Sequence, residues 1–188
     1  MAMKKIFGFG IFVLMAQTAF AQDATPPEKP TKETATLGQI YVEGESAPWE
    51  TRCTKTDRDM DPCQLFQLLR DSDGGPVAEV NFFAVPTGSE AAAGAAFVAP
   101  LETSLPSGVI IQVDSNEAKV YPFSFCNSYG CVARIGFTAD ELANLKSGNQ
   151  AIFQIVPAAA PDAVVRLSMS LAGFTAGFDA VAATISQP

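Results

Sequence analysis

Four cysteines in two close pairs limit most strongly what this chain can fold into. Nine residues separate Cys53 from Cys63, and four separate Cys126 from Cys131. An even number of cysteines is typical of disulfides in proteins that leave the cytosol, and the N-terminal pattern described below predicts export. Of the three pairings that four cysteines allow, we favour Cys53–Cys63 with Cys126–Cys131, because each would close a short loop between adjacent strands. The chain-entropy model gives roughly 2–3 kcal/mol of stability for each such bond.

Two other roles for these cysteines fit their spacing less well. Four thiolates could hold zinc, but the ligand pairs of such sites are usually about two to four residues apart, and the nine-residue gap after Cys53 is too long. A thiol redox role is disfavoured because neither pair is C-x-x-C. We therefore predict structural disulfides, with no metal and no cofactor.

The N-terminus has the three parts of a secretory signal peptide. Lys4 and Lys5 supply positive charge, residues 6–16 are apolar, and a small-residue A-x-A site ends at Ala21. The apolar stretch is too short to cross the roughly 30 Å hydrocarbon core of a bilayer, which argues against a retained anchor. We predict that residues 1–21 are cleaved off and that the mature chain does not span a membrane.

The mature chain divides into a leader and one domain. Residues 22–36 are rich in proline, threonine, lysine and glutamate and have little to bury, so we expect a disordered leader. Residues 37–188 have the length of one ordinary domain.

Most apolar segments of this domain are short and bounded by glycine, proline or aspartate, which is typical of β-strands. The ten predicted strands are Gln39–Glu43, Trp49–Cys53, Cys63–Leu69, Val77–Val85, Phe97–Leu101, Val109–Asp114, Lys119–Phe123, Cys131–Gly136, Ala151–Val156 and Val164–Leu171. A hairpin turn is predicted at residues 71–75, and the alanine-rich residues 89–96 are expected to form a helical turn or a loop.

One helix is well indicated after Thr138. Thr138 and Glu141 form a capping-box pattern, and Gly148 could end the helix in the left-handed conformation. A second short helix is expected at about Thr175–Thr184. Ten strands with one or two helices predict an all-β fold of two packed antiparallel sheets, a sandwich, with a barrel as the alternative.

Charge and composition exclude several functions. The net charge is −8, and loss of the signal peptide removes two lysines and no acidic residue. A chain this acidic repels phosphate backbones, so we expect no nucleic-acid partner. The sequence contains no histidine, which excludes Ser-His-Asp and Cys-His nucleophile systems and removes the commonest ligand of transition metals.

An acidic run, Asp57–Asp61, resembles the start of a calcium-binding loop. Pro62 stands where such a loop needs glycine, and Leu68 stands where it needs a bidentate glutamate. We interpret the run as a solvated acidic turn inside the first disulfide loop.

Aromatic residues surround the second cysteine pair. If Phe125 and Tyr129 face outward with Asn127 between them, this loop is a candidate contact surface, since rigid aromatic side chains are good anchors. The alternative is that the rings plug one end of the sandwich. We favour burial, because that is the usual fate of phenylalanine.

An ordered set of landmarks runs through most of the chain, from about Tyr41 to Thr184. The set comprises Trp49, Cys53, Cys63, Leu105-Pro106-Ser107-Gly108-Val109, Tyr121-Pro122-Phe123, Cys126, Gly130-Cys131, Lys146-Ser147-Gly148 and Leu171-Ala172-Gly173-Phe174. In this order the chain resembles the invasion-associated locus B family of bacterial envelope proteins. It departs from the family at Thr51, where a bulkier aliphatic residue is expected, and that departure concerns packing.

The resemblance implies an immunoglobulin-like β-sandwich in the periplasm or on the outer surface of a Gram-negative bacterium. Some family members are associated with entry into host cells, and the family has no catalytic motif to carry over. We expect a non-catalytic envelope protein that binds a protein or envelope component through loops 57–61, 86–96 or 125–129. The alternatives are a carboxylate-dependent hydrolase of an envelope polysaccharide and a periplasmic carrier with an internal cavity.

Overall fold

The computed structural model describes residues 29–185. In this part of the chain the elements are β1 (Ile40–Ser46), β2 (Trp49–Thr54), β3 (Cys63–Arg70), β4 (Pro76–Phe83), β5 (Ala93–Ala99), η1 (Leu105–Ser107), β6 (Val109–Val113), β7 (Lys119–Tyr121), β8 (Phe125–Asn127), β9 (Gly130–Phe137), α1 (Ala139–Ser147), β10 (Gln150–Ile155), β11 (Val165–Ser170) and α2 (Phe174–Ala183).

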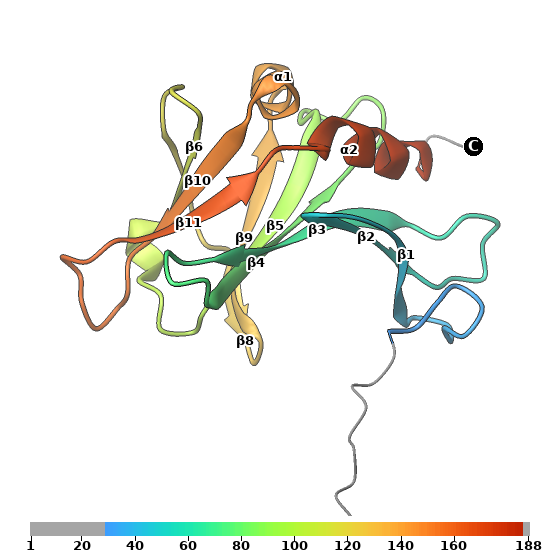
Figure 1. The fold of residues 1–188 in the computed structure, drawn as a ribbon, viewed down its shortest axis with the longest axis horizontal. Coiled ribbons are helices and arrows are strands. Elements are labelled where there is room, and N and C mark those ends of the chain that lie inside the picture. The colour runs from blue at the N-terminus through green and yellow to red at the C-terminus, as the bar shows by residue number, and fades with distance from the viewer. Residues whose placement is uncertain (1–28, 186–188) are drawn as a thin grey trace, which may run out of the picture.

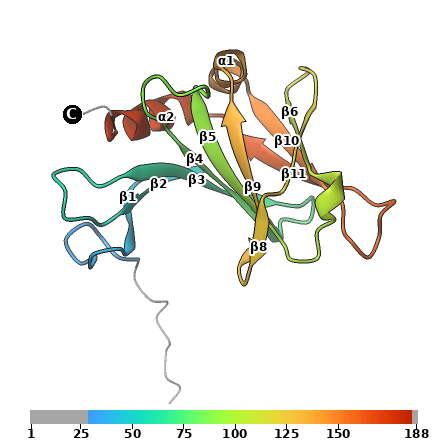
Figure 2. The same ribbon diagram turned by 180° about the vertical axis from the view of Figure 1, so that it is seen from behind.

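All of these strands belong to one antiparallel sheet. Its order is β7-β6-β10-β11-β3-β4-β5-β9-β8, with β2 and then β1 added beside β3. The sheet curls into a half-barrel (Figures 1 and 2). Its two outermost strands, β7 and β8, are consecutive in the chain and are joined by residues 122–124. A ring contact between Tyr121 on β7 and Phe137 on β9, 5.9 Å between centroids, brings the two ends of the sheet together.

The predicted fold class, all-β and antiparallel with one or two short helices, is confirmed. The two facing layers, which the prediction assigned to separate sheets, are opposite walls of one curled sheet. Residues 119–127 make the sheet continuous, because this extended segment pairs first with β6 and then with β9. Pro122 lies where the segment changes partner, and proline has no N–H to donate to a strand ladder.

Each of the ten predicted strands is present, with some ends shifted. β8 is absent from the prediction, because three residues between a proline and a turn are too few to show alternation. The alanine-rich residues 89–96 are not a helical turn, since β5 begins at Ala93. Small residues are needed there because the Phe83 ring lies over Gly94, where an added Cβ would collide with it.

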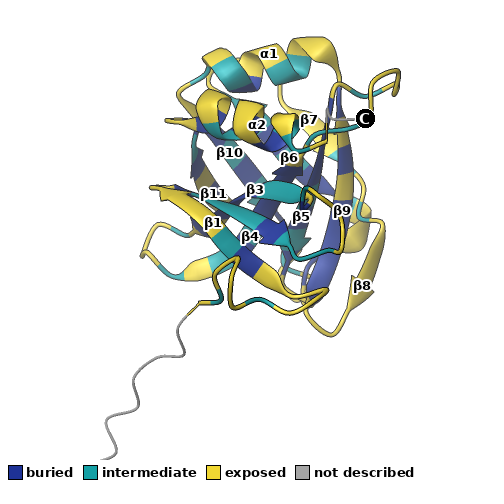
Figure 3. Cartoon of the chain, turned by 90° about the vertical axis from the view of Figure 1, so that its right-hand side faces the viewer, coloured by how far each residue is buried: buried dark blue, intermediate teal, exposed yellow. Residues whose placement is uncertain are grey.

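The core lies between the inner face of the curled sheet and α2, and phenylalanine dominates it. Phe97 and Phe153 are fully buried and stack with 5.1 Å between ring centroids. Phe82 contacts Trp49 at 6.0 Å and Phe174 at 5.0 Å, so the first turn of α2 is fixed against β2 and β4. Burial is concentrated in the middle strands, and the helices expose their outer sides (Figure 3). The predicted second helix is therefore present, and it covers the core.

The helix predicted after Thr138 is present as α1, with its capping box. The Thr138 hydroxyl accepts a hydrogen bond from the Glu141 N–H, and the Glu141 carboxylate accepts one from the Thr138 N–H. The predicted left-handed stop is wrong, because Gly148 has φ −77°. A Cβ at this position would lie 2.8 Å from both the Asn144 carbonyl oxygen and a Val113 methyl carbon, so close packing requires the glycine.

The buried side-chain amide of Gln67 joins β3 and β11, the two neighbouring strands that share the fewest backbone pairs. β3 and β11 share only the bridge between Arg70 and Ser168. Beyond it, the buried Gln67 side chain takes the place of a backbone partner. Its Nε2 donates to the Ser170 carbonyl at 3.1 Å, and its Oε1 accepts from the Ser170 N–H at 3.0 Å. Both backbone groups are thereby satisfied where the strands diverge.

The N-terminal boundary differs from the prediction. Residues 1–21, predicted as the signal peptide, lie outside the described residues, as do residues 22–28 of the predicted leader. Residues 29–36 are not a disordered leader, since they form a turn in which the Ala35 N–H donates to the Thr31 carbonyl. Lys29 pairs with Glu45 and Glu50, which face each other on β1 and β2. The cation relieves their repulsion, and this anchors the segment.

Candidate binding surface

The predicted contact loop is β8 and the turn that follows it. This hairpin projects from the body on the side away from α1 and α2 (Figures 1 and 3). The Phe125 side chain is 41% exposed and that of Tyr129 is 90% exposed. The favoured interpretation, that these rings are buried, is therefore wrong. Asn127 shapes the turn, because its Oδ1 accepts hydrogen bonds from the N–H groups of Tyr129 and Gly130 at 2.9 and 3.2 Å.

The second disulfide holds this hairpin closed. The structure pairs Cys126 with Cys131 and Cys53 with Cys63, as predicted. In both bonds the cysteines lie directly opposite each other on neighbouring strands, with 4.0 Å between Cα atoms. Because residues 126 and 131 flank the turn, their bond fixes the position from which Tyr129 extends.

β8 continues an apolar surface on the outside of the curled sheet. Successive side chains of a strand point to opposite faces, so the cross-strand register defines rows on the outer side. One row, in order across β3, β4, β5, β9 and β8, consists of Leu68, Glu79, Val98, Val132 and Phe125.

A second row, across β3, β4, β5 and β9, consists of Phe66, Asn81, Ala96 and Arg134. These two rows, together with Phe83 and Tyr129, are called the outer face below. Within it Leu68 is 39% and Phe83 37% exposed.

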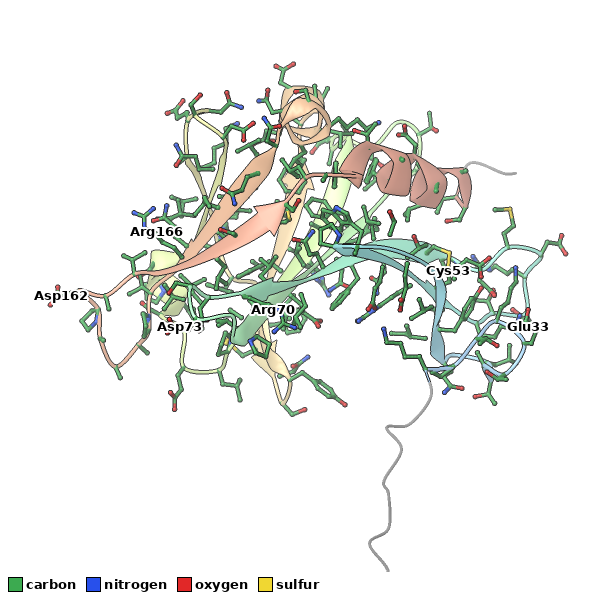
Figure 4. All side chains as sticks on the ribbon, in the orientation of Figure 1. Glu33, Cys53, Arg70, Asp73, Asp162 and Arg166 are labelled. Carbon is green, nitrogen blue, oxygen red and sulfur yellow. A yellow bond between two sulfur atoms is a disulfide. The ribbon has the colours of Figure 1, made fainter. Side chains whose placement is uncertain are left out.

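A groove lies on this outer face where β4 begins, next to the β3–β4 turn. Its volume is about 460 Å³, and it is lined by Leu68, Pro76, Val77, Ala78, Glu79, Val98, Ala99, Pro100 and Tyr129. Glu79 is the one charged residue of this lining. Figure 4 labels Arg70 and Asp73 at the β3–β4 turn beside this end of the sheet. The groove therefore combines apolar walls, the carboxylate of Glu79 and the exposed aromatic side chain of Tyr129.

Two arginines cover aromatic rings of the outer face. The Arg134 guanidinium carbon lies 5.1 Å from the Phe125 ring centre, and that of Arg52 lies 3.1 Å from the Phe66 ring centre. Arg52 is also paired with Glu50 at 2.8 Å. These cations screen Phe66 and part of Phe125 from water. The large apolar side chains that remain exposed on the outer face are therefore Leu68 on β3, Phe83 on β4, and Phe125 and Tyr129 of the β8–β9 hairpin.

The sequence prediction includes only the hairpin residues of the outer face and misses its part on β3, β4 and β5. The pattern of apolar residues on β3 and β4 could have indicated it. An antiparallel sheet with one solvated face usually alternates apolar and polar residues. β3 and β4 instead carry apolar residues on both faces, with Leu68 next to Leu69 and Phe83 next to Phe82. Apolar residues on both faces of these strands indicate that the outer side of the sheet is suited to bind another molecule.

The first disulfide loop is not the fully solvated turn that the sequence predicts. Asp57 and Asp59 are exposed, but Asp61 is buried. Its carboxylate accepts hydrogen bonds from the Thr56 N–H at 2.7 Å and from the hydroxyls of Thr56 and Tyr41, both at 2.9 Å. These bonds, the first above all, lower the pKa of Asp61 to about 2. Asp61 therefore organises the loop. Within residues 29–185 no cluster of histidine, cysteine, aspartate or glutamate is suited to hold a metal.

A second carboxylate lines a smaller pocket between β7 and α1. This pocket has a volume of about 270 Å³. Partial burial of Glu141 favours its neutral form, but hydrogen bonds from Lys119 at 2.8 Å, the Thr138 N–H and the Tyr121 hydroxyl at 2.7 Å outweigh burial and lower its pKa to about 2. A general acid needs the opposite shift. Glu141 is thus held ionised by groups that fix the helix start.

The interior of the half-barrel is filled where a carrier would need a cavity. Phe82, Phe97, Phe153, Leu167 and Met169 all lack solvent exposure and belong to one continuous core. Within the described residues, no helix is long and apolar enough to cross a membrane.

Comparisons with known proteins identify the family and the fold. A family model described as invasion associated locus B (IalB) protein matches residues 49–182. Invasion protein B homologues of Brucella abortus strain 2308 and of Brucella abortus biovar 1 strain 9-941 are each 33% identical over 84 residues, or 45% of this chain and 48% of theirs. The match thus spans about half the length of these curated relatives.

A solved structure has a similar fold over about three quarters of this chain. The crystal structure of invasion associated protein B from Bartonella henselae superposes with a TM-score of 0.63 at 18% identity, covering 77% of this chain and 98% of that one. At this identity the likeness shows the fold alone. The family model, in contrast, runs from the start of β2 almost to the end of α2. The chain belongs to the invasion-associated locus B family.

Proposed function

We propose that this chain is an exported, non-catalytic envelope protein that binds another protein through its outer face. The observation that carries this proposal is that four large apolar side chains on the outer face, those of Leu68, Phe83, Phe125 and Tyr129, are exposed. Large apolar side chains gathered on one exposed face among polar residues are typical of an interaction site. Rigid aromatic side chains contribute most of the binding energy in many interfaces.

Disulfides and family membership support a location outside the cytoplasm. Disulfides persist in oxidising compartments such as the periplasm and the cell surface. The signal-peptide pattern at residues 1–21 supports export by the general secretory route. We place the mature protein in the periplasm or on the outer surface of a Gram-negative bacterium. In an invasive species the partner would be a host surface protein, and elsewhere a protein of the envelope.

Neither of the two most strongly hydrogen-bonded carboxylates, Asp61 and Glu141, has the environment of a general acid. Asp61 and Glu141 both have pKa values lowered to about 2, so both are ionised at any physiological pH. Glycoside hydrolysis by two carboxyl groups requires one of them to remain protonated. The hydrogen bonds of Asp61 stabilise the first disulfide loop, and those of Glu141 stabilise the start of α1.

Capture from an envelope extract tests the proposal. The protein, exported and processed in cells, is immobilised as the native form and as the outer-face variant Leu68→Ser/Phe83→Ser/Phe125→Ser. We expect the native protein to retain a partner that the variant loses by about tenfold or more, since contact residues of this kind contribute about 1 kcal/mol or more each. Recovered proteins are quantified by mass spectrometry.

A matched control removes exposed apolar residues elsewhere. Leu37→Ser/Val120→Ser/Val164→Ser changes three side chains that are exposed and lie outside the outer face. This variant should capture the same partner as the native protein. Equal capture by the outer-face variant, or loss of capture in the control alone, would refute the proposal.

A further inference from the structure

The groove on the outer face contains a carboxylate in an apolar setting. Glu79 is the second residue of its row, with Leu68 opposite it on β3 and Val98 opposite it on β5. Within residues 29–185 no salt bridge reaches Glu79, and its one hydrogen bond is a 3.5 Å contact from the Asn81 amide. Most partly buried carboxylates are better compensated, as Glu50 and Glu141 are in this protein.

The rest of the groove is suited to an aliphatic chain that ends in a cation. Leu68, Val98, Pro76 and Pro100 provide apolar walls, and the Tyr129 side chain stands at the rim. Lysine and arginine bury their methylene stems along apolar surface while the charged group reaches a polar partner. An aromatic ring at the rim adds attraction for a cation.

We propose that this groove binds a lysine or arginine side chain of the partner protein, with the cationic group paired to Glu79. This inference rests on the proposed function and names the chemistry of the partner. Charge complementarity supports it, because the chain has a net charge of −8 and attracts basic surfaces. The volume of about 460 Å³ accommodates a whole side chain and part of its backbone.

A pair of synthetic peptides tests this inference. One is a capped pentapeptide with a central lysine flanked by valine and threonine, and the other has norleucine in place of lysine. We expect the lysine peptide to shift the backbone amide signals of Leu68, Glu79, Val98 and Tyr129 in the NMR spectrum, with a Kd of about 1 mM. The norleucine peptide should bind about tenfold more weakly, because it keeps the stem and lacks the charge.

Two variants with the same change in net charge separate a specific contact from general attraction. Glu79→Gln should weaken binding of the lysine peptide about tenfold, since it removes the charge in the groove. Glu117→Gln removes an exposed carboxylate at the β6–β7 turn and should leave the Kd unchanged. The inference fails if both peptides bind equally, if Glu79→Gln binds as the native protein does, or if no groove signal shifts.

These outcomes are distinct from a failure of the proposed function. If the outer-face variant loses its partner while Glu79→Gln keeps that partner and the peptide affinity, the outer face is the interface and the cation site is wrong. If the peptide binds as expected and the outer-face variant still captures its partner, the groove does bind a cationic side chain, but not one of that partner, and the proposed function is wrong.

Discussion

Replacing Phe82 with alanine should lower the free energy of unfolding by about 4 kcal/mol, whereas the same change at Phe83 should lower it by less than about 1 kcal/mol. The two residues are neighbours on β4 and point to opposite faces of the sheet. Phe82 has no solvent exposure and contacts Trp49, Phe137 and Phe174. Its removal leaves a cavity that the surrounding rings cannot fill without moving.

Phe83 is the matched control for this prediction. It lies on the outer face, 37% exposed, with Gly94 beneath its ring. Urea unfolding followed by Trp49 fluorescence measures both variants, with the slope against urea expected to stay constant. Similar losses of stability for the two variants would mean that the outer face is packed like a core, which contradicts its assignment as a contact surface.

Removing the first disulfide by Cys53→Ala/Cys63→Ala should lower the free energy of unfolding by roughly 2–3 kcal/mol. The bond joins β2 to β3 and closes the loop in which Asp61 is buried. Without it, the unfolded chain gains conformational freedom. The Cys53 side chain lies in the buried part of the sheet, so it must be replaced by a small apolar residue.

The second disulfide provides the comparison. Cys126→Ala/Cys131→Ala affects a hairpin at the edge of the sheet, which can open locally while the core stays folded. We expect a smaller fall in global stability and faster amide hydrogen exchange in residues 125–131. An unchanged urea midpoint after loss of the first disulfide would show that it does not stabilise the domain.

Local signals in the sequence predict much of this fold. Alternation and turn residues locate ten strands, and Thr138 with Glu141 locates the start of α1, because these features depend on residues close together in the chain. The pairing of the cysteines follows from the same reasoning, since each bond joins strands that are adjacent in sequence.

Features that depend on distant residues are not predictable in this way. The hydrogen bonds between Gln67 on β3 and Ser170 on β11 join residues 103 positions apart. Gly148 looks like a left-handed helix stop until Val113 and Leu171 are seen beside it. The outer face likewise requires the register of five strands, which places Leu68, Val98 and Phe125 in one row.

Photo-crosslinking in living cells tests the central claim most directly. A benzophenone amino acid replaces Tyr129 on the outer face in one protein and Asp162 in another; Figure 4 labels Asp162 on the β10–β11 loop. The protein carrying the probe at position 129 should crosslink to a distinct envelope or host protein after irradiation, and the protein carrying it at position 162 should not. Crosslinks from position 162 with none from position 129 would contradict binding through the outer face.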